Sequence, residues 1–356
     1  MKFSKNLQDK IDILKNRQTP IKLGSVAFSS PLLLAPMASI CNWPFRLLME
    51  DLGAGGTVSE LISCHGINYD NKKTHEMLRV DPREKNVGIQ LFGEDPKAMA
   101  LAAKIAEGHG PKFIDINMGC PVKKVVTKGG GSALLKNPQG LSEFLTTIKE
   151  AISIPLTIKI RTGWDQDQVN ADEIIKVAHD SGVEFVAIHG RTRAQQYTGQ
   201  ANWNYIEELA ANCPLPLIGN GDLHQAHQVK ERLSKTLCQA LMLARGPLRN
   251  PFIFLEAADV DNHFNFTASD YWEITQRLYQ YICEGFQDER HRLVQIRKLI
   301  VWFTGGFPHA TQFRGHAFTS QNLDEVMRLT EDYFLSLNQI SKRINHDEAF
   351  MTSGHG

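Results

Sequence analysis

The chain has 356 residues, of which 42% are hydrophobic and 22% are charged. This length and composition allow a large core without disulfide or metal staples, which excludes intrinsic disorder, a collagen-like chain and a small disulfide scaffold. Lysine plus arginine and aspartate plus glutamate both number 39, so no overall charge attracts nucleic acid and any such binding depends on local patches.

The cysteines and the apolar runs of the sequence indicate the cellular compartment. Its six cysteines are scattered, with no Cys-x-x-Cys pair and no His/Cys spacing that suits zinc. We therefore expect free thiols in a reducing cytosol and no metal site. No apolar run reaches the roughly 18 residues of a membrane span, and residues 1–20 lack the apolar core of a signal peptide. We expect a cytoplasmic protein.

Short apolar runs recur along the first two thirds of the chain, with room for a helix between neighbours. The runs cover residues 32–35, 57–60, 87–91, 113–117, 156–160, 185–189, 216–219 and 240–243. Segments 96–107 and 171–179 between them have helical periodicity. Eight such units are typical of a (β/α)8 TIM barrel. A doubly wound sheet is the alternative, but the turn after the first run, Ala35-Pro36-Met37-Ala38-Ser39, lacks the G-x-G-x-x-G pattern.

After about residue 256 the strand-like runs stop. Helical periodicity covers 270–286, 290–303 and 323–337, and Asn322 with Glu325 resembles a capping box for the last helix. The sequence therefore predicts an α/β TIM barrel over 1–255, an all-helical domain over 256–345 and a disordered tail over 346–356.

Polar residues follow most of the apolar runs. They are Pro36, Glu60, Gln90, Asn117, Lys159, Arg161, His189, Asn220, Asp222 and Arg245. A single such residue is more commonly a turn or cap. Because barrels place their chemistry at the carboxyl ends of the strands, the convergence of so many indicates a ligand site.

The last two strand ends indicate a phosphate. Gly219-Asn220-Gly221-Asp222 and Ala244-Arg245-Gly246 can bring backbone N–H groups to an anion, although two ordinary glycine turns are the alternative. Lys159 adds positive charge, and the amides of Gln90 and Asn117 suit the imide edge of a ring. The combination indicates FMN rather than a sugar phosphate.

The segment after the fourth run, 117–135, holds a cysteine between glycine and proline, a glycine triplet and no acidic residue. A lone cysteine is more commonly a small buried hydrophobe, but Cys120, between glycine and proline on this face, is expected to be exposed and functional. Lys123, Lys124 and Lys128 indicate an anionic substrate larger than one phosphate, with a solvated basic loop as the alternative.

These motifs resemble the tRNA-dihydrouridine synthases, most closely their bacterial B-type branch, from about residue 33 to 337. The matching stretches are Ala35-Pro36-Met37, Thr57-Val58-Ser59-Glu60, Asp115-Ile116-Asn117-Met118-Gly119-Cys120-Pro121, Gly131-Ser132-Ala133-Leu134-Leu135, Lys159-Ile160-Arg161-Thr162-Gly163-Trp164, His189-Gly190-Arg191-Thr192-Arg193 and Asn220-Gly221-Asp222. The resemblance implies a monomeric FMN-bearing barrel with a helical tRNA-binding domain. It also implies NADPH as reductant and a uridine of the tRNA D-loop as substrate, with U17 favoured.

The resemblance also implies residue roles. The cofactor residues are Pro36, Met37, Gln90, Lys159, His189, Asn220, Gly221, Asp222, Ala244, Arg245 and Gly246. Asn117 would face the uracil, and Cys120 would protonate C5 after hydride reaches C6 from FMN. A thiol with an unperturbed pKa of about 8.5 is mostly protonated near pH 7 and can act as a general acid. Because neighbouring lysines would lower that pKa, we expect Lys123 and Lys124 to point to RNA phosphates instead of the sulfur.

Basic residues predicted to contact tRNA lie in two regions. They are Lys123, Lys124, Lys128, Arg191, Arg193, Arg297, Lys298 and Arg314. Residues 290–314 contain five basic residues, no acidic one, and Trp302 and Phe303. A solvated helix face is the alternative, but with the resemblance we expect RNA backbone contact that weakens with salt.

The chain departs from the family pattern at a few positions. Ser39 and Ala244 stand where glycine is usual, Asn42 where aspartate is common, and Leu299 where histidine often follows Arg-Lys. Cys41 also lies on the catalytic face, and we interpret it as a packing residue. Three other functions compete: an FMN oxidoreductase of a small pyrimidine-like molecule, similar to dihydroorotate dehydrogenases, a non-catalytic RNA chaperone, and a flavin-free phosphate-binding isomerase or lyase.

Overall fold

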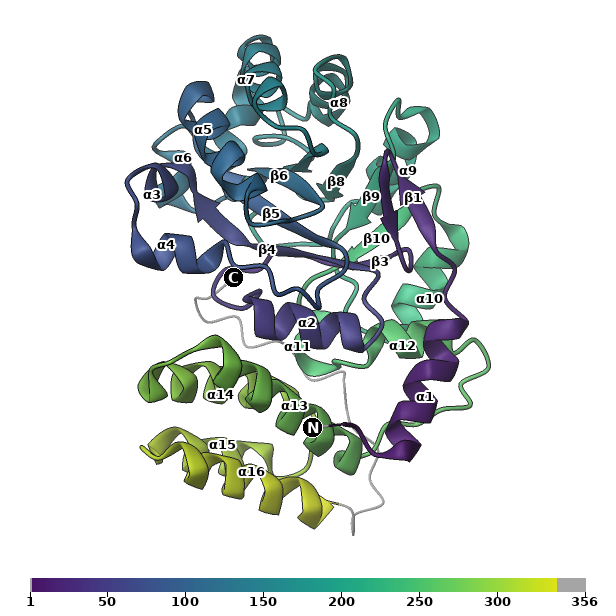
Figure 1. The fold of residues 1–356 in the computed structure, drawn as a ribbon. Helices are drawn as coiled ribbons and strands as arrows, with labels where there is room; N and C mark the ends of the chain where they lie inside the picture. The colour runs from purple at the N-terminus through teal and green to yellow at the C-terminus, as the bar shows by residue number, and fades with distance from the viewer. Residues whose placement is uncertain (1, 338–356) are drawn as a thin grey trace.

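A closed barrel of eight parallel strands dominates the structure, a computed structural model that describes residues 2–337 (Figure 1). The strands are β3 (Leu32–Leu34), β4 (Gly56–Ser63), β5 (Val87–Phe92), β6 (Phe113–Met118), β7 (Leu156–Arg161), β8 (Val186–His189), β9 (Leu217–Asn220) and β10 (Ala240–Leu243). Each strand pairs with the next in sequence, and β10 pairs with β3 to close the ring. The predicted TIM barrel is confirmed, with all eight apolar runs forming its strands.

Helices surround this barrel. They are α2 (Trp43–Asp51), α3 (Cys64–Asn68), α4 (Lys72–Met77), α5 (Pro96–Glu107), α6 (Lys123–Val126), the 3-10 helix η1 (Gly131–Lys136), α7 (Pro138–Ala151), α8 (Ala171–Asp180), α9 (Trp203–Asn212), α10 (Ala226–Lys235), α11 (Gly246–Arg249) and α12 (Ile253–Ala258). Helix α5 shows why the sequence forms them. The Asp95 side chain accepts the Ala98 N–H at 2.6 Å, Pro96 occupies the first turn, and Met99, Ala102 and Ala106 bury one face. Both predicted segments, 96–107 and 171–179, are helical.

A short hairpin closes the amino-terminal end of the barrel. Strands β1 (Ile21–Leu23) and β2 (Val26–Phe28) pair antiparallel, and Phe28 meets Phe113 and Phe185 edge-on, with ring centroids 6.0 and 5.9 Å apart. Phe113 begins β6 and Phe185 precedes β8, so the three rings fill the bottom of the barrel. The opposite end, where the strands terminate, is the end at which TIM barrels hold their ligands.

Up to residue 337, four helices follow the barrel: α13 (Ala268–Gly285), α14 (Glu289–Phe303), α15 (Ala310–Thr319) and α16 (Leu323–Leu337). Three were predicted, whereas α15 was not. The predicted capping box of α16 is only half formed. Asn322 accepts the Glu325 N–H at 3.0 Å, but the Glu325 carboxylate accepts the Ser320 hydroxyl at 2.5 Å.

The C-terminal helices share a core with the barrel. One apolar cluster runs from α1 (Lys5–Asn16) through α2 and α12 to α13–α16, and within it Phe252 stacks on Phe266 with centroids 3.9 Å apart. The predicted boundary at 255/256 falls inside α12, and the division into two domains stays a prediction. The tail over 346–356 lies outside the described residues. Within residues 2–337, no helix is long and apolar enough to cross a membrane.

Candidate active site

The open end of the barrel gathers the predicted polar side chains. Gln90 comes from β5, Asn117 from β6, Lys159 from β7, His189 from β8 and Asn220 from β9. The strand register sets Asn117 beside Lys159 and His189 beside Asn220. Parallel strands that end at the same edge therefore bring together residues up to 130 positions apart.

A directed chain of hydrogen bonds runs along one side of this mouth. The Gln90 amide nitrogen donates to Asp115 Oδ2 at 2.7 Å, and its oxygen accepts from Asn117 Nδ2 at 2.8 Å. Asn117 Oδ1 in turn accepts the backbone N–H of Cys120 at 2.8 Å. Because an ionised carboxylate can only accept, Asp115 fixes which way both amides face. The chain thus joins a buried carboxylate to the loop that carries the cysteine.

Asp115 was not among the predicted site residues. It lies two positions before Asn117 on β6, so both side chains face the same side of the strand. Its second oxygen accepts the Thr157 hydroxyl at 2.7 Å. Burial raises the pKa of Asp115 to about 6, while the hydrogen bonds from Gln90 and Thr157 oppose that rise. The carboxylate is therefore mostly ionised at neutral pH.

Cys120 is partly buried in the loop between β6 and α6. Its carbonyl accepts the Ser132 backbone N–H at 3.2 Å and the Ser132 hydroxyl at 2.8 Å, which ties the cysteine to the glycine-rich segment. Gly131 there has φ +59°, and an added Cβ would lie 2.9 Å from the Cys120 carbonyl oxygen. The approach of these two backbones therefore requires glycine.

The thiol of Cys120 stays protonated at neutral pH. Burial raises its pKa, and the Val122 backbone and Arg161 only partly oppose this. Lys123 and Lys124 are exposed and do not contribute to the shift. The surroundings of the sulfur therefore match those that a general acid needs. Cys41, by contrast, is fully buried beside the Ala35 carbonyl, and burial raises its pKa to about 12, as expected for a packing residue.

Positive charge concentrates on the other side of the mouth. Lys159 Nζ donates to Asn220 Oδ1 at 3.1 Å, and Asn220 Nδ2 donates to the Met242 carbonyl at 2.6 Å. Burial lowers the pKa of Lys159 to about 8, and Asp115 opposes that fall. Burial and the nearby cations lower the pKa of His189 well below its usual value, so the imidazole is neutral. The cations acting on it are Lys159, Arg161, Arg191 and Arg245.

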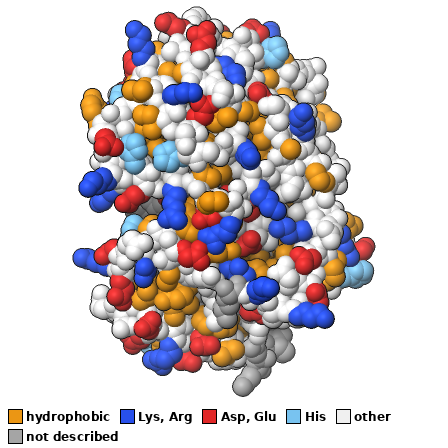
Figure 2. Space-filling model, viewed as in Figure 1, with side chains coloured by type: hydrophobic (Ala, Val, Ile, Leu, Met, Phe, Trp, Pro, Cys, Tyr) orange, Lys and Arg blue, Asp and Glu red, His pale blue; other side chains and the backbone are white. Residues whose placement is uncertain are grey.

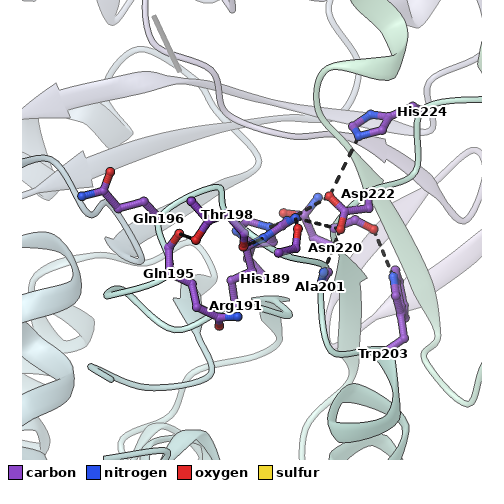
Figure 3. Close-up of polar contacts among 12 residues, drawn as sticks. His189, Arg191, Gln195, Gln196, Thr198, Ala201, Trp203, Asn220, Asp222 and His224 are labelled. Atoms are coloured by element: carbon purple, nitrogen blue, oxygen red, sulfur yellow. Dashed lines mark hydrogen bonds and ion pairs between the residues drawn. The ribbon is translucent and has the colours of Figure 1, made fainter. Parts of the chain in front are cut away.

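Arg191 and Asp222 form a closed ion pair behind this cluster (Figure 3). Both terminal nitrogens of Arg191 lie 2.9 Å from the Asp222 carboxylate. In addition, Nη2 donates to the Gly199 carbonyl at 2.7 Å, Nε donates to the Thr198 carbonyl at 3.2 Å, and Nη1 lies 3.2 Å from His189 Nε2. Arg191 is only 3% exposed. The structure thus places the predicted tRNA contact Arg191 in the interior, where it supports the β9 turn. The carboxylate of Asp222, predicted to belong to the phosphate loop, faces Arg191 and the Ala201 N–H.

The turn after β9 has a strained backbone that this ion pair stabilises. Asp222 has φ +53° and Gly221 φ +138°, and Trp203 Nε1 donates to the Gly221 carbonyl at 3.0 Å. A Cβ on Gly221 would lie 2.5 Å from the Ala201 Cβ. Glycine is required at this position, and the turn is held by contacts from the β8–α9 loop.

The remaining predicted residues lie on the loops after the strands and on the C-terminal helices. Ala244, Arg245 and Gly246 form the turn after β10, while Pro36 and Met37 begin the loop after β3. Arg193 lies 4.0 Å from the ring of Trp164. Lys123, Lys124 and Lys128 are exposed on the loop after β6. Arg314 is on α15, which contacts α14 and α16 and lies apart from the strand ends.

Two side chains of α14 reach the loop after β3. Lys298 Nζ donates to the Ser39 carbonyl at 2.5 Å, and Asn42 Nδ2 donates to Gln295 Oε1 at 3.1 Å. Arg297, between them in sequence, has two shielded guanidinium nitrogens without a hydrogen-bond partner in the described part of the chain. Figure 2 shows lysine and arginine side chains along the band between the barrel and the C-terminal helices.

The fold and the mouth together define a TIM-barrel enzyme whose site combines a cationic cluster with a protonated cysteine. The sequence matches the family described as "Dihydrouridine synthase (Dus)" over residues 33–339. The chain belongs to this family.

Related proteins align with this chain over most of its length. The probable tRNA-dihydrouridine synthase of Rickettsia conorii is 32% identical, with 90% of this chain and 98% of that protein aligned. The tRNA-dihydrouridine synthase B of Proteus vulgaris is 34% identical, with 88% and 98% aligned. That of Vibrio cholerae is 33% identical, again with 88% and 98% aligned. The predicted family resemblance is confirmed.

Solved structures share the fold at low sequence identity. A complex of 2-naphthoyl-CoA reductase with 2-naphthoyl-CoA has a TM-score of 0.53 at 12% identity and covers 69% of this chain and 52% of its own. Histamine dehydrogenase from Rhizobium sp. 4-9 has a TM-score of 0.54 at 13% identity and covers 76% and 51%. The chain spans about half the length of these structures, and the likeness concerns the fold alone.

Proposed function

We propose that this protein reduces one uridine of the tRNA D-loop to 5,6-dihydrouridine, with FMN at the barrel mouth and NADPH as reductant. Family membership gives the reaction class. The observation that carries the chemical assignment is the hydrogen-bonded chain from Asp115 through Gln90 and Asn117 to the backbone of Cys120. It fixes a protonated thiol beside two oriented amides.

The donors at the mouth fit FMN. Arg245 and the cation of Lys159 supply positive charge, and the neutral imidazole of His189 lies among them. Arg191 is paired with Asp222. The positive charge of Lys159 and Arg245 suits a phosphate-bearing cofactor. Lys159, Gln90 and the turns after β9 and β10 would hold this cofactor. When bound and reduced by NADPH, it would supply the hydride that reaches uracil C6.

The protein's own residues account for the proton that completes the reduction. Hydride addition at C6 leaves an enolate in the uracil, and C5 must then take a proton. The neutral thiol of Cys120 can give that proton, and the resulting thiolate regains one from solvent. The Asn117 amide oxygen accepts the Gly119 and Cys120 N–H groups, and its nitrogen donates to Gln90. One N–H of Asn117 therefore remains to orient the uracil.

The RNA must bring its base out of the stack to reach these groups, which costs a few kcal/mol. The exposed Lys123, Lys124 and Lys128 stand beside Cys120 and can neutralise phosphates around the extruded nucleotide. We propose that residues 256–345 serve as the RNA-binding region that recovers this cost, with Arg314 among its contacts.

The test uses unmodified tRNA, NADPH and the purified full chain, followed by digestion of the RNA and mapping of dihydrouridine by mass spectrometry. We expect one modified D-loop position, lost in Cys120→Ala. A protein that binds FMN and oxidises NADPH with a free pyrimidine, but leaves tRNA unchanged, would contradict the proposal and support a small-molecule oxidoreductase.

A further inference from the structure

The loop between β3 and α2 is held to α14 by two contacts. This loop, residues 35–42, begins with Pro36 and Met37 at the barrel mouth. Lys298 donates to the Ser39 carbonyl at 2.5 Å, and Gln295 accepts from Asn42 at 3.1 Å. Because positions 295 and 298 are one turn apart, both contacts come from the same face of the helix.

A bulge in β4 provides a third contact. Val58 pairs with Gly88 of β5, and Leu61 pairs with Gln90. Two residues of β4, Ser59 and Glu60, therefore stand opposite a single residue of β5, which defines a β-bulge. The Ser59 hydroxyl accepts the Gln90 backbone N–H at 2.9 Å, where the ladder is interrupted. The carboxylate of Glu60 accepts the backbone N–H of Ser39.

Ser39 is therefore held on both sides of its backbone. Glu60 takes its N–H, and Lys298 donates to its carbonyl. Both partners are charged, and hydrogen bonds to ionised groups are about twice as strong as those between neutral groups. The restraint matters because Ser39 has φ +61°, a left-handed conformation that serine disfavours.

We infer that Lys298 is a positioning residue that, together with Glu60, fixes residues 36–42 at the barrel mouth. This role is distinct from the predicted tRNA contact of Lys298, and the salt dependence of tRNA binding separates the two. The neighbouring Arg297 has its Nε and Nη2 atoms shielded from solvent and without a hydrogen-bond partner among residues 2–337. It stays the predicted phosphate contact of the proposed function. The expected effect on catalysis rests on the proposed function, whereas the contact between Lys298 and the loop does not.

The experiment compares Lys298→Met with Arg297→Met in the full chain. In Lys298→Met we expect backbone amides of residues 37–42 to exchange with deuterium severalfold faster without RNA. The kcat for tRNA reduction should fall about tenfold because the mouth loop is displaced, with the KM for tRNA unchanged. The salt dependence of tRNA binding should stay as in the wild type. Arg297→Met should keep normal exchange and reduce the slope of log K against log salt by about 1.

The opposite pattern would overturn the inference. If Lys298→Met leaves exchange unchanged and lowers the salt slope, Lys298 is a phosphate contact. Ser39→Gly provides a second variant, since it keeps both backbone contacts and removes the strain. We expect its loop to stay protected, and a loop that exchanges freely would show that the backbone contacts do not hold it. The exchange measurement needs no RNA, so a failure of the proposed function would be seen separately.

Discussion

The side-chain oxygen of Asn117 accepts the backbone N–H of Cys120 at 2.8 Å. A residue at the end of a rigid barrel strand thereby sets the backbone of the loop that carries the thiol. The orientation of the Asn117 amide is set in turn by Gln90, and that of Gln90 by Asp115. Placement of the thiol consequently depends on a carboxylate that touches neither the loop nor the sulfur.

Removal of that carboxylate should disturb the chemistry. In Asp115→Ala, the Gln90 amide nitrogen loses its acceptor, and the side-chain amides of Gln90 and Asn117 are free to flip. We expect kcat for tRNA reduction to fall about ten- to a hundredfold. In Asp115→Asn, the amide oxygen can still accept from Gln90 while the Thr157 hydroxyl rotates to accept the new N–H, so the loss should stay within about tenfold. Single-turnover reduction of tRNA measures both. Equal losses in the two variants would show that the negative charge beside Lys159 matters more than the hydrogen-bond direction.

The two cysteines at the mouth should respond differently to the same change. Cys120→Ala removes the proposed acid, and dihydrouridine formation should fall by about two to four orders of magnitude. Cys41→Ala alters a buried thiol that faces the Ala35 carbonyl and should keep the activity. Mapping of dihydrouridine after a fixed incubation compares them. Activity that survives in Cys120→Ala would rule out the thiol as the proton donor.

The raised pKa of Cys120 has a consequence for the pH profile. A general acid is active while protonated, so activity is lost as pH rises through its pKa. Because burial raises that pKa, the alkaline limb of kcat should lie above the unperturbed thiol range of about 8.5. The rate of tRNA reduction between pH 7 and 10, with the reductant step completed beforehand, tests this. A limb near pH 7 would mean that the thiolate dominates at neutral pH.

Much of this architecture could be predicted from sequence for a physical reason. Parallel barrel strands are buried on both faces and read as continuous apolar runs, and their ends meet at one rim. Gln90, Asn117, Lys159, His189 and Asn220 could therefore be assigned to one site without knowledge of any contact. Helix α15 was missed because only Ala310, Phe313 and Ala317 are buried in it, which gives a weak periodic signal.

Which side chains pair with one another could not be predicted in the same way. The sequence shows that Arg191 is charged, but the ion pair with Asp222 joins residues 31 positions apart. The positive charge was therefore assigned to tRNA, whereas the fold buries it. Lys298 likewise follows Arg297 in a basic segment, and only the three-dimensional structure separates their surroundings. Asp115 lies inside a strand, where sequence alone does not distinguish a support from a site residue.

Lys159 should make cofactor binding depend on pH. Its pKa of about 8 without ligand reflects burial, and a bound anion would favour the charged form and raise that pKa. Binding then takes up a proton, so affinity for FMN should fall as pH rises above about 8, by up to about tenfold per pH unit. Titration of flavin fluorescence between pH 6.5 and 9.5 measures this. Lys159→Gln should bind FMN more weakly and lose that pH dependence, whereas an unchanged dependence would assign the proton to another group.

The lysines beside Cys120 should govern RNA affinity without governing cofactor binding. Each phosphate contact contributes about 0.7–0.9 to the slope of log K against log salt. Replacement of Lys123, Lys124 and Lys128 by glutamine should therefore lower the slope by roughly 2 to 3 and raise the KM for tRNA. FMN affinity should not change, since these side chains are exposed on the loop. Lys235→Gln is the matched control, because Lys235 is also exposed but is paired with Glu231 on α10. If the control lowers the slope as much as a single loop lysine does, RNA binds through diffuse charge and not through the loop after β6.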